Sequence, residues 1–359
     1  MDFGLSEEQE LLQETVRGFV ANECPPARLR EHFDAADGVD PALWQGMAEM
    51  GLAGLLVPEV HGGAGLKVLD LALVMEVLGS AALPGPLLGH SMASLAIMDG
   101  GDEAQKHGWL PRLAEGRAVA SVALCEAGSA WEPDQWRCRA SGETVSGSKL
   151  YVPHADRADL LVVGVEGGEL VLVECGQGGV KIERVDGIDR TRPVCRVEFD
   201  RAPCQRLAPA TWVARRVRDV GLALLAADSF GAATKLIDVS VEYAKTREQF
   251  GMKIGQFQAI KHQIARLGTA IEPTRALVWH AAYAIDHLPE ESERAAALAK
   301  SHITDRAMHT ARMAVELHGG LGFTWDCDVQ MWFKRCMFNR TFLGTPEVLR
   351  ERCAALAGW

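Results

Sequence analysis

The sequence of 359 residues lacks the features that mark several large classes of protein. Its nine cysteines are scattered and form no CxxC pair, which argues against a disulfide framework and against a zinc site. No basic stretch followed by an apolar leader opens the chain, and no apolar run approaches the roughly 18 residues that cross a bilayer. We therefore expect a soluble cytoplasmic protein with free thiols, no metal site and no membrane partner.

Positive charge is also in deficit, because 37 Lys and Arg stand against 48 Asp and Glu and leave a net charge of −11. Nothing global therefore favours nucleic acid or an anionic membrane surface as a partner. An anionic ligand would need a local cluster of Arg and backbone N–H groups. The composition is otherwise ordinary for a globular protein, with 48% hydrophobic residues, and the length allows two or three folding units.

Apolar periodicity predicts a mostly helical segment over residues 1–117. Ser6 followed by Gln9 forms a capping box at the start of the first helix, and Pro25-Pro26 ends that helix. Further helices are expected over residues 41–50, 69–78 and 88–98.

The pattern changes over residues 118–208, where short apolar runs are separated by Gly, Asp and Pro. This spacing predicts a small antiparallel β-domain, with strands at 120–124, 144–145, 150–152, 160–165, 170–173 and 194–199. The helical period returns over residues 209–359, and helices are expected at 222–246, 258–287 with a kink at Pro273, 291–318 and 328–337. The fold class is therefore α+β, mostly α, in the order helical, β, helical.

Two motifs about seventy residues apart carry the strongest functional signal. The first is Arg247-Glu248-Gln249-Phe250-Gly251, running on to Phe257-Gln258, and the second is His318-Gly319-Gly320-Leu321-Gly322-Phe323. Each places small, hydrogen-bonding and aromatic residues at a helix boundary. Such a boundary is suited to holding a flavin dinucleotide.

Together with the opening segment 1–9 and the Gly-rich stretch 54–65, these motifs resemble the acyl-CoA dehydrogenase family over essentially the whole chain. The resemblance implies a helical N-terminal domain, a middle β-domain and a C-terminal four-helix bundle. It also implies FAD as cofactor and α,β-desaturation of an acyl-CoA thioester, in which a carboxylate removes the α-proton and the β-hydrogen leaves as hydride. An oxidase shares the same motifs.

By resemblance, Arg247, Gln249, Phe250 and Gln258 contact the dinucleotide of a flavin held mainly by a neighbouring subunit. Gly319, Gly320 and Gly322 would let backbone N–H groups approach the same nucleotide. The alternative is that Arg247 caps a helix C-terminus and Phe250 fills the core. Glu316 stands where the family usually has glutamine, and a carboxylate there would repel a phosphate.

The β-domain keeps fewer of the family's flavin contacts. In the stretch 124–130, Cys125 stands where relatives carry a ring-binding threonine, although Ser129 remains. In the stretch 147–153, Tyr151 is able to stack on a ring edge, whereas Pro153 has no hydroxyl to offer. An equal alternative is that these residues now serve only as core and turn.

Both positions at which relatives place the catalytic base lack a carboxylate. They fall by resemblance at Leu343, before Gly344-Thr345, and near Gly221. Asp228 lies two helical turns after Gly221 on roughly the same face, which makes it a candidate base, although a helical Asp is more often solvated or salt-bridged. His318 beside the Gly-Gly turn is expected to be structural.

Three hypotheses follow for function. The chain resembles the base-lacking subunit type of bacterial α2β2 acyl-CoA dehydrogenases, which would complete the flavin site of a homologous partner subunit. Alternatively, it is a self-sufficient homo-oligomeric acyl-CoA dehydrogenase that uses Asp228 or another carboxylate. A third hypothesis is a non-catalytic acyl-CoA-binding or assembly protein on an inherited enzyme fold. Arg215, Arg216 and Arg218 would meet coenzyme A phosphates or form a solvated face.

Overall fold

The computed structural model describes residues 4–35, 38 and 40–359. The chain folds into two compact units, each assembled from separate stretches of sequence. Unit 1 takes in the N-terminal residues up to Arg30, Ala72–Leu83 and Leu222–Trp359, and unit 2 takes in Glu31–Leu71 and Pro84–Gly221. The division into segments 1–117, 118–208 and 209–359 stays a prediction.

The first helix begins as its sequence predicts. Ser6 Oγ accepts a hydrogen bond from the Gln9 backbone N–H at 3.2 Å, and the Ser6 N–H donates to Gln9 Oε1 at 3.1 Å. A second helix, which the sequence analysis did not predict, begins at Pro26, where the fixed φ of proline suits the first helical position. The N-terminal helices are α1 (Glu7–Glu23), α2 (Pro26–Ala35), α3 (Pro41–Glu49), α4 (Val68–Ser80), α5 (Leu87–Gly100) and α6 (Glu103–Ala114).

Unit 2 contains two four-stranded sheets, with strand orders β1-β4-β5-β8 and β2-β3-β7-β6. Most neighbours are antiparallel as predicted, but β1 pairs with β4 in parallel, so the expectation of a purely antiparallel domain is wrong at this pair. The strands are β1 (Ala120–Ala123), β2 (Arg139–Ser141), β3 (Thr144–Pro153), β4 (Leu160–Val165), β5 (Glu169–Glu174), β6 (Val180–Val185), β7 (Val194–Pro203) and β8 (Gln205–Arg206).

Strand β3 joins two runs that the sequence predicts as separate strands. Its register against β7 is irregular between Val145 and Gly147 and again between Lys149 and Val152. These irregularities interrupt the apolar alternation without ending the strand. The second one places Tyr151, a predicted flavin contact, outside the regular pairing.

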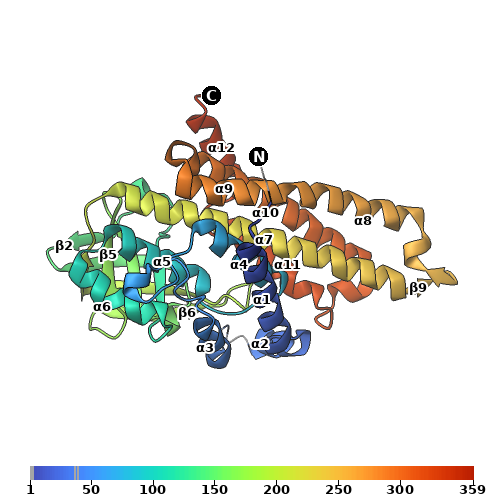
Figure 1. The fold of residues 1–359 in the computed structure, drawn as a ribbon, viewed down its shortest axis with the longest axis horizontal. Helices are drawn as coiled ribbons and strands as arrows, with labels where there is room; N and C mark the ends of the chain where they lie inside the picture. Colours follow the sequence, from blue (N-terminus) through green and yellow to red (C-terminus); the bar gives the residue numbers. More distant parts are fainter. Residues whose placement is uncertain (1–3, 36–37, 39) are drawn as a thin grey trace. The chain divides into compact units, whose positions relative to one another are not determined.

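The C-terminal helices form the bundle of unit 1, and a short hairpin lies at the end of this bundle where α7 passes into α8 (Figure 1). The predicted kink at Pro273 is confirmed, because a 3-10 turn (η5, Glu272–Thr274) separates α8 from α9. The remaining elements are α7 (Thr211–Thr246), β9 (Glu248–Gln249), β10 (Met252–Lys253), α8 (Gln258–Ile271), α9 (Arg275–His287), α10 (Pro289–Leu317), η6 (Gly319–Phe323), α11 (Val329–Thr341) and α12 (Pro346–Leu356).

Helix α7 is longer and more apolar than the sequence analysis expects. It begins at Thr211, and one window of 18 residues reaches a mean hydropathy of 1.4, which is sufficient by length and composition alone to cross a membrane. The expectation that no apolar run approaches this length is therefore wrong. Of that window, 83% is buried inside the protein, as in a core helix.

Two glycines bring the backbones of α4 and α7 into direct contact within unit 1. A Cβ atom at Gly79 would lie 2.1 Å from the carbonyl oxygen of Asp228, and one at Gly231 would lie 1.9 Å from that of Glu76. Neither position has room for a side chain. This close approach fixes the height of Asp228 along the bundle.

Candidate flavin and acyl-CoA site

The first motif forms an exposed turn between β9 and β10. Phe250 (φ 55°) and Gly251 (φ 77°) occupy its two central positions, as in a type I′ hairpin. Phe250 is 89% exposed and contacts Phe257 edge-on with ring centroids 6.2 Å apart, so the alternative in which it fills the core of this chain is wrong.

The polar residues predicted beside this turn are exposed as well. Arg247, Gln249 and Gln258 all lie on the surface of unit 1. Among the residues that the structure describes, no ion pair engages the guanidinium of Arg247, whereas neighbouring Glu248 pairs with Lys253 at 2.7 Å. Arg247 therefore keeps its hydrogen-bonding capacity for a ligand.

The second motif forms the 3-10 turn η6 after α10, and its three glycines differ in their surroundings. A Cβ atom at Gly319 or Gly320 would meet nothing within 4 Å, and Gly319 has a positive φ of 60°. Their backbones are open to a ligand. At Gly322, in contrast, a Cβ would lie 2.2 Å from the carbonyl oxygen of Val315, so this glycine is required by packing.

Tyr243 on α7 joins the two motifs. Its ring stacks on that of His318 with centroids 4.2 Å apart, and its hydroxyl lies 3.4 Å from the His318 carbonyl oxygen as a hydrogen-bond donor. The His318 ring is buried, its Nδ1 lies 2.7 Å from the carbonyl oxygen of Ala314, and burial lowers its pKa. His318 thus has the structural place expected of it, and both motifs lie at one end of the bundle.

In unit 2, the two predicted ring contacts occupy exposed, left-handed positions. Ser129 (φ 59°) and Tyr151 (φ 54°) both have positive φ, which is uncommon for residues other than glycine. Tyr151 is 46% exposed and stacks on Trp131 with ring centroids 6.4 Å apart and an interplanar angle of 25°. The sequence did not predict Trp131, whose ring packs against one side of the Tyr151 ring.

A buried ion pair, also unpredicted, holds the segment 124–130 against β3. Lys149 Nζ donates to Glu126 Oε1 at 2.7 Å, and the backbone N–H groups of Arg137 and Cys138 donate to the same carboxylate at 2.7 and 3.0 Å. Burial acts to raise the pKa of Glu126, but these hydrogen bonds outweigh it and the pKa is lowered. Glu126 is therefore committed to holding the segment in place.

The position of the missing threonine offers no donor to a flavin ring. The Cys125 thiol is buried and donates back to the Glu126 carbonyl oxygen at 3.4 Å. Burial raises the pKa of this thiol to about 12. Within unit 1, the exposed Arg247 and the open Gly319–Gly320 backbone suit a dinucleotide. Within unit 2, the residues predicted for the flavin ring keep an aromatic surface at Tyr151, and Cys125 has a thiol in place of a hydroxyl.

Neither position of the family's base carries a carboxylate. Leu343 is only 1% exposed and has a positive φ of 59° in the turn between α11 and α12, and Gly221 is buried within α7. Helix α12 begins at Pro346, with Glu347 in its first turn.

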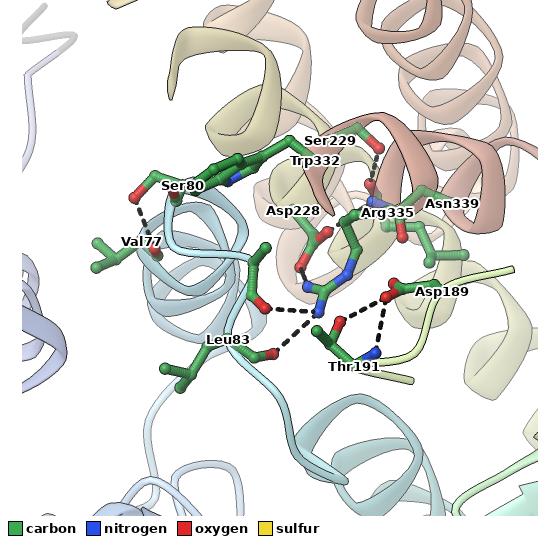
Figure 2. A network of polar contacts seen from close by, with 12 residues as sticks. Val77, Ser80, Leu83, Asp189, Thr191, Asp228, Ser229, Trp332, Arg335 and Asn339 are labelled. Carbon is green, nitrogen blue, oxygen red and sulfur yellow. Dashed lines mark hydrogen bonds and ion pairs between the residues drawn. The ribbon is translucent and has the colours of Figure 1, made fainter. Parts of the chain in front are cut away.

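Asp228, the remaining candidate base, is fully buried. Figure 2 shows its contacts with Arg335 and Asn339. Its carboxylate accepts from Arg335 Nη1 at 3.1 Å and from Asn339 Nδ2 at 2.6 Å. Arg335 also donates to the carbonyl oxygens of Ala82 and Leu83 at 3.1 and 3.0 Å. The structure therefore places Asp228 in a network that ties α7 and α11 to the end of the α4 segment.

Lys300 on α10 is another buried charge that the sequence analysis missed. Its ammonium group donates to the carbonyl oxygens of Gly344 and Arg340, the latter at 3.4 Å. Burial, followed by the neighbouring charge of Arg340, lowers the pKa of Lys300 to about 7. This lysine holds the turn that contains Leu343.

Of the three arginines considered for coenzyme A, two are engaged inside unit 2. Arg216 Nε lies 3.1 Å from Asp99 Oδ2, and Arg218 is buried and bonded to Glu132 and Asp219. The solvated-face alternative is thus wrong for Arg218. Arg215 is exposed.

Comparison with known proteins decides the family. The profile "Acyl-CoA dehydrogenase, N-terminal domain" matches residues 6–117, and "Acyl-CoA dehydrogenase, C-terminal domain" matches residues 213–357. The curated protein "Acyl-CoA dehydrogenase IpdE2" of Mycobacterium tuberculosis is 34% identical over 348 residues, which cover 96% of each chain. The chain belongs to the acyl-CoA dehydrogenase family.

Solved structures agree with this assignment. The Tcur3481-Tcur3483 steroid ACAD shares 29% identity with a TM-score of 0.90 and covers 98% of both chains. The ChsE4-ChsE5 complex from Mycobacterium tuberculosis shares 25% identity with a TM-score of 0.90 and covers 100% of this chain and 99% of the other. The α+β, mostly helical fold, FAD as the cofactor and the class of oxidoreductases acting on CH–CH bonds follow from this family membership.

Proposed function

We propose that the chain is a subunit of a hetero-oligomeric acyl-CoA dehydrogenase and completes the flavin site of a homologous partner that supplies the base. One contrast carries this proposal. The residues of unit 1 that are predicted to contact the nucleotide are exposed, as at Arg247 and Gly320, whereas both base positions hold the buried apolar residues Leu343 and Gly221.

The names of two structural relatives support an assembly with a second, different chain. Both the Tcur3481-Tcur3483 steroid ACAD and the ChsE4-ChsE5 complex pair two differently named chains. By analogy, we infer a cytoplasmic assembly of two unlike chains. Because one relative is named a steroid ACAD, a bulky polycyclic acyl-CoA belongs among the first substrates to test.

The proposed roles follow from the chemistry of the side chains. Arg247 would bind pyrophosphate oxygens in bidentate fashion, Gln249 and Gln258 would hydrogen-bond the nucleotide, and Phe250 would cover it. The backbone N–H groups of Gly319 and Gly320 would approach the same phosphates. FAD supplies the hydride acceptor in this chemistry. The chain's own residues hold and orient it.

The test is the amount of FAD per chain, measured by absorbance on the protein purified alone and then with its candidate partner. We expect little FAD and no acyl-CoA turnover in the lone protein, and one FAD for each pair of unlike chains in the active complex. Arg247→Gln should lower the FAD content of the complex without unfolding it, because Arg247 is exposed. Robust acyl-CoA turnover by the homo-oligomer alone would refute the proposal.

The self-sufficient alternative uses Asp228 or another carboxylate as the base, and the Asp228 carboxylate is bound to Arg335 and Asn339. If Asp228 were the base, Asp228→Asn would abolish turnover of the lone protein and leave FAD bound. A non-catalytic acyl-CoA-binding protein would instead show no flavin in any complex. Assaying with both oxygen and an artificial electron acceptor separates an oxidase from a dehydrogenase.

A further inference from the structure

A pocket of 420 Å³ lies within unit 1, remote in sequence from the Arg247 motif. Helix α10 provides most of its lining, and α11 and α12 contribute one arginine each. Its lining includes His302, Asp305, Arg306, Arg312, Arg340 and Arg350.

The charge of this lining is opposite in sign to that of the whole protein. Four arginines and one aspartate give a local charge of +3 with the histidines neutral, on a chain whose net charge is −11. Glu347 bonds to Arg340 from outside the lining, and counting it still leaves +2. Such a local cluster is what an anionic ligand needs on an acidic protein.

The single carboxylate does not neutralise all the arginines. Asp305 is held between Arg340, at 3.2 Å, and Arg350. Among the described residues, Arg306 and Arg312 have no carboxylate partner, and both side chains are exposed. Two guanidinium groups therefore face the pocket with their hydrogen-bonding capacity unused.

The positive charge of these arginines also affects the pKa of His302. Its pKa is lowered, first by burial and then by the charges of Arg306 and Arg350. An anion placed among these arginines would relieve their mutual repulsion, and the planar guanidinium fork matches the oxygen geometry of a phosphate.

We propose that this pocket binds a phosphate-bearing anion, either free phosphate or the phosphate end of a nucleotide. The proposal is independent of the flavin site, because none of its residues belongs to the two flavin motifs. It can therefore be tested separately from the proposed completion of a partner's flavin site.

The test is isothermal titration of the full-length protein with orthophosphate, pyrophosphate and ADP at constant ionic strength set with chloride. We expect saturable binding that the double variant Arg306→Gln/Arg312→Gln weakens by roughly tenfold or more, since each charge-assisted hydrogen bond contributes appreciably. The matched control is Arg266→Gln/Arg294→Gln, which removes two exposed arginines of unit 1 that do not line this pocket.

Titrations in the Arg247→Gln background reduce the contribution of the proposed flavin nucleotide site. Equal weakening by both double variants would show a general charge effect and overturn the proposal, as would the lack of saturable binding. If ADP binds at least roughly tenfold more tightly than orthophosphate, the ligand is a nucleotide. Comparable affinities identify free phosphate as the ligand.

Discussion

The carboxylate of Asp228 on α7 and the guanidinium of Arg335 on α11 form an ion pair, 3.1 Å apart, in which both side chains are completely buried. The two residues are 107 positions apart in sequence, and their ion pair lies within an apolar helical bundle. Each charge depends on the other, because a buried charge without a partner is strongly unfavourable.

The first prediction concerns this pair. Arg335→Met alone should lower the free energy of unfolding by about 3–5 kcal/mol, because it leaves the Asp228 carboxylate uncompensated. The double variant Asp228→Leu/Arg335→Met should regain more than half of that loss. Urea denaturation of the natural protein, Asp228→Leu, Arg335→Met and the double variant measures the effect. Additive losses in the double variant would contradict a coupled pair.

A second prediction concerns the link between the flavin motifs. Tyr243→Ala should cost about 1–3 kcal/mol of stability and lower FAD retention in the complex, because the His318 ring loses its stacking partner. Tyr243→Phe keeps the ring and gives up only a long hydrogen bond, so it should resemble the natural protein. Thermal unfolding and FAD content are the measurements. Equal behaviour of the two variants would show that the stacking is unimportant.

The glycines of the second motif provide a third prediction with a built-in control. Gly322→Ala forces a Cβ to within 2.2 Å of the Val315 carbonyl oxygen and should destabilise unit 1, whereas Gly320→Ala has open space around it. Gly320→Ala should therefore leave the unfolding temperature unchanged while reducing FAD affinity, because the methyl group occupies the approach to the backbone. A stable Gly322→Ala protein would disprove the packing role.

The fourth prediction concerns pH. The pKa of Lys300 is lowered to about 7 in the folded protein. A lysine in the unfolded chain titrates near 10.4, so between these values the unfolded chain binds a proton that the folded chain does not, and stability rises with pH. The contribution is at most about 1.4 kcal/mol per pH unit.

Lys300→Met should remove this contribution. Buried thiols such as Cys125, whose pKa is raised to about 12, act in the opposite direction above the thiol pKa of the unfolded chain. The useful quantity is therefore the difference in unfolding free energy between the natural protein and Lys300→Met, measured by urea denaturation from pH 7.5 to 9.5. A difference independent of pH would show that Lys300 is charged throughout.

Local signals account for what the sequence predicts well. The capping box at Ser6 and the kink at Pro273 each depend on a few adjacent residues, and the structure contains both. Family membership and the FAD cofactor are predicted because each of the two motifs is a continuous stretch of sequence.

Pairings between distant residues could not be predicted in the same way. The parallel pairing of β1 with β4 depends on which apolar runs meet, and the run lengths carry no such information. Lys300 and Lys149 look like ordinary polar positions in the sequence, and the salt-bridge partner of Asp228 could not be named. The groups that allow all three side chains to be buried lie elsewhere in the chain. Strand β6 was missed since much of its surface is exposed and it lacks an apolar run.

The discontinuous make-up of unit 1 has a consequence for synthesis on the ribosome. Helix α1 and most of α4 belong to the same unit as Leu222–Trp359, so they emerge long before the rest of that unit, whereas all of unit 2 has been made once Gly221 has emerged. Domains generally fold as units, beginning with the part made first. We therefore expect unit 2 to fold during translation, before α1 is packed into unit 1. In truncated nascent chains that end before α11, α1 should remain sensitive to protease.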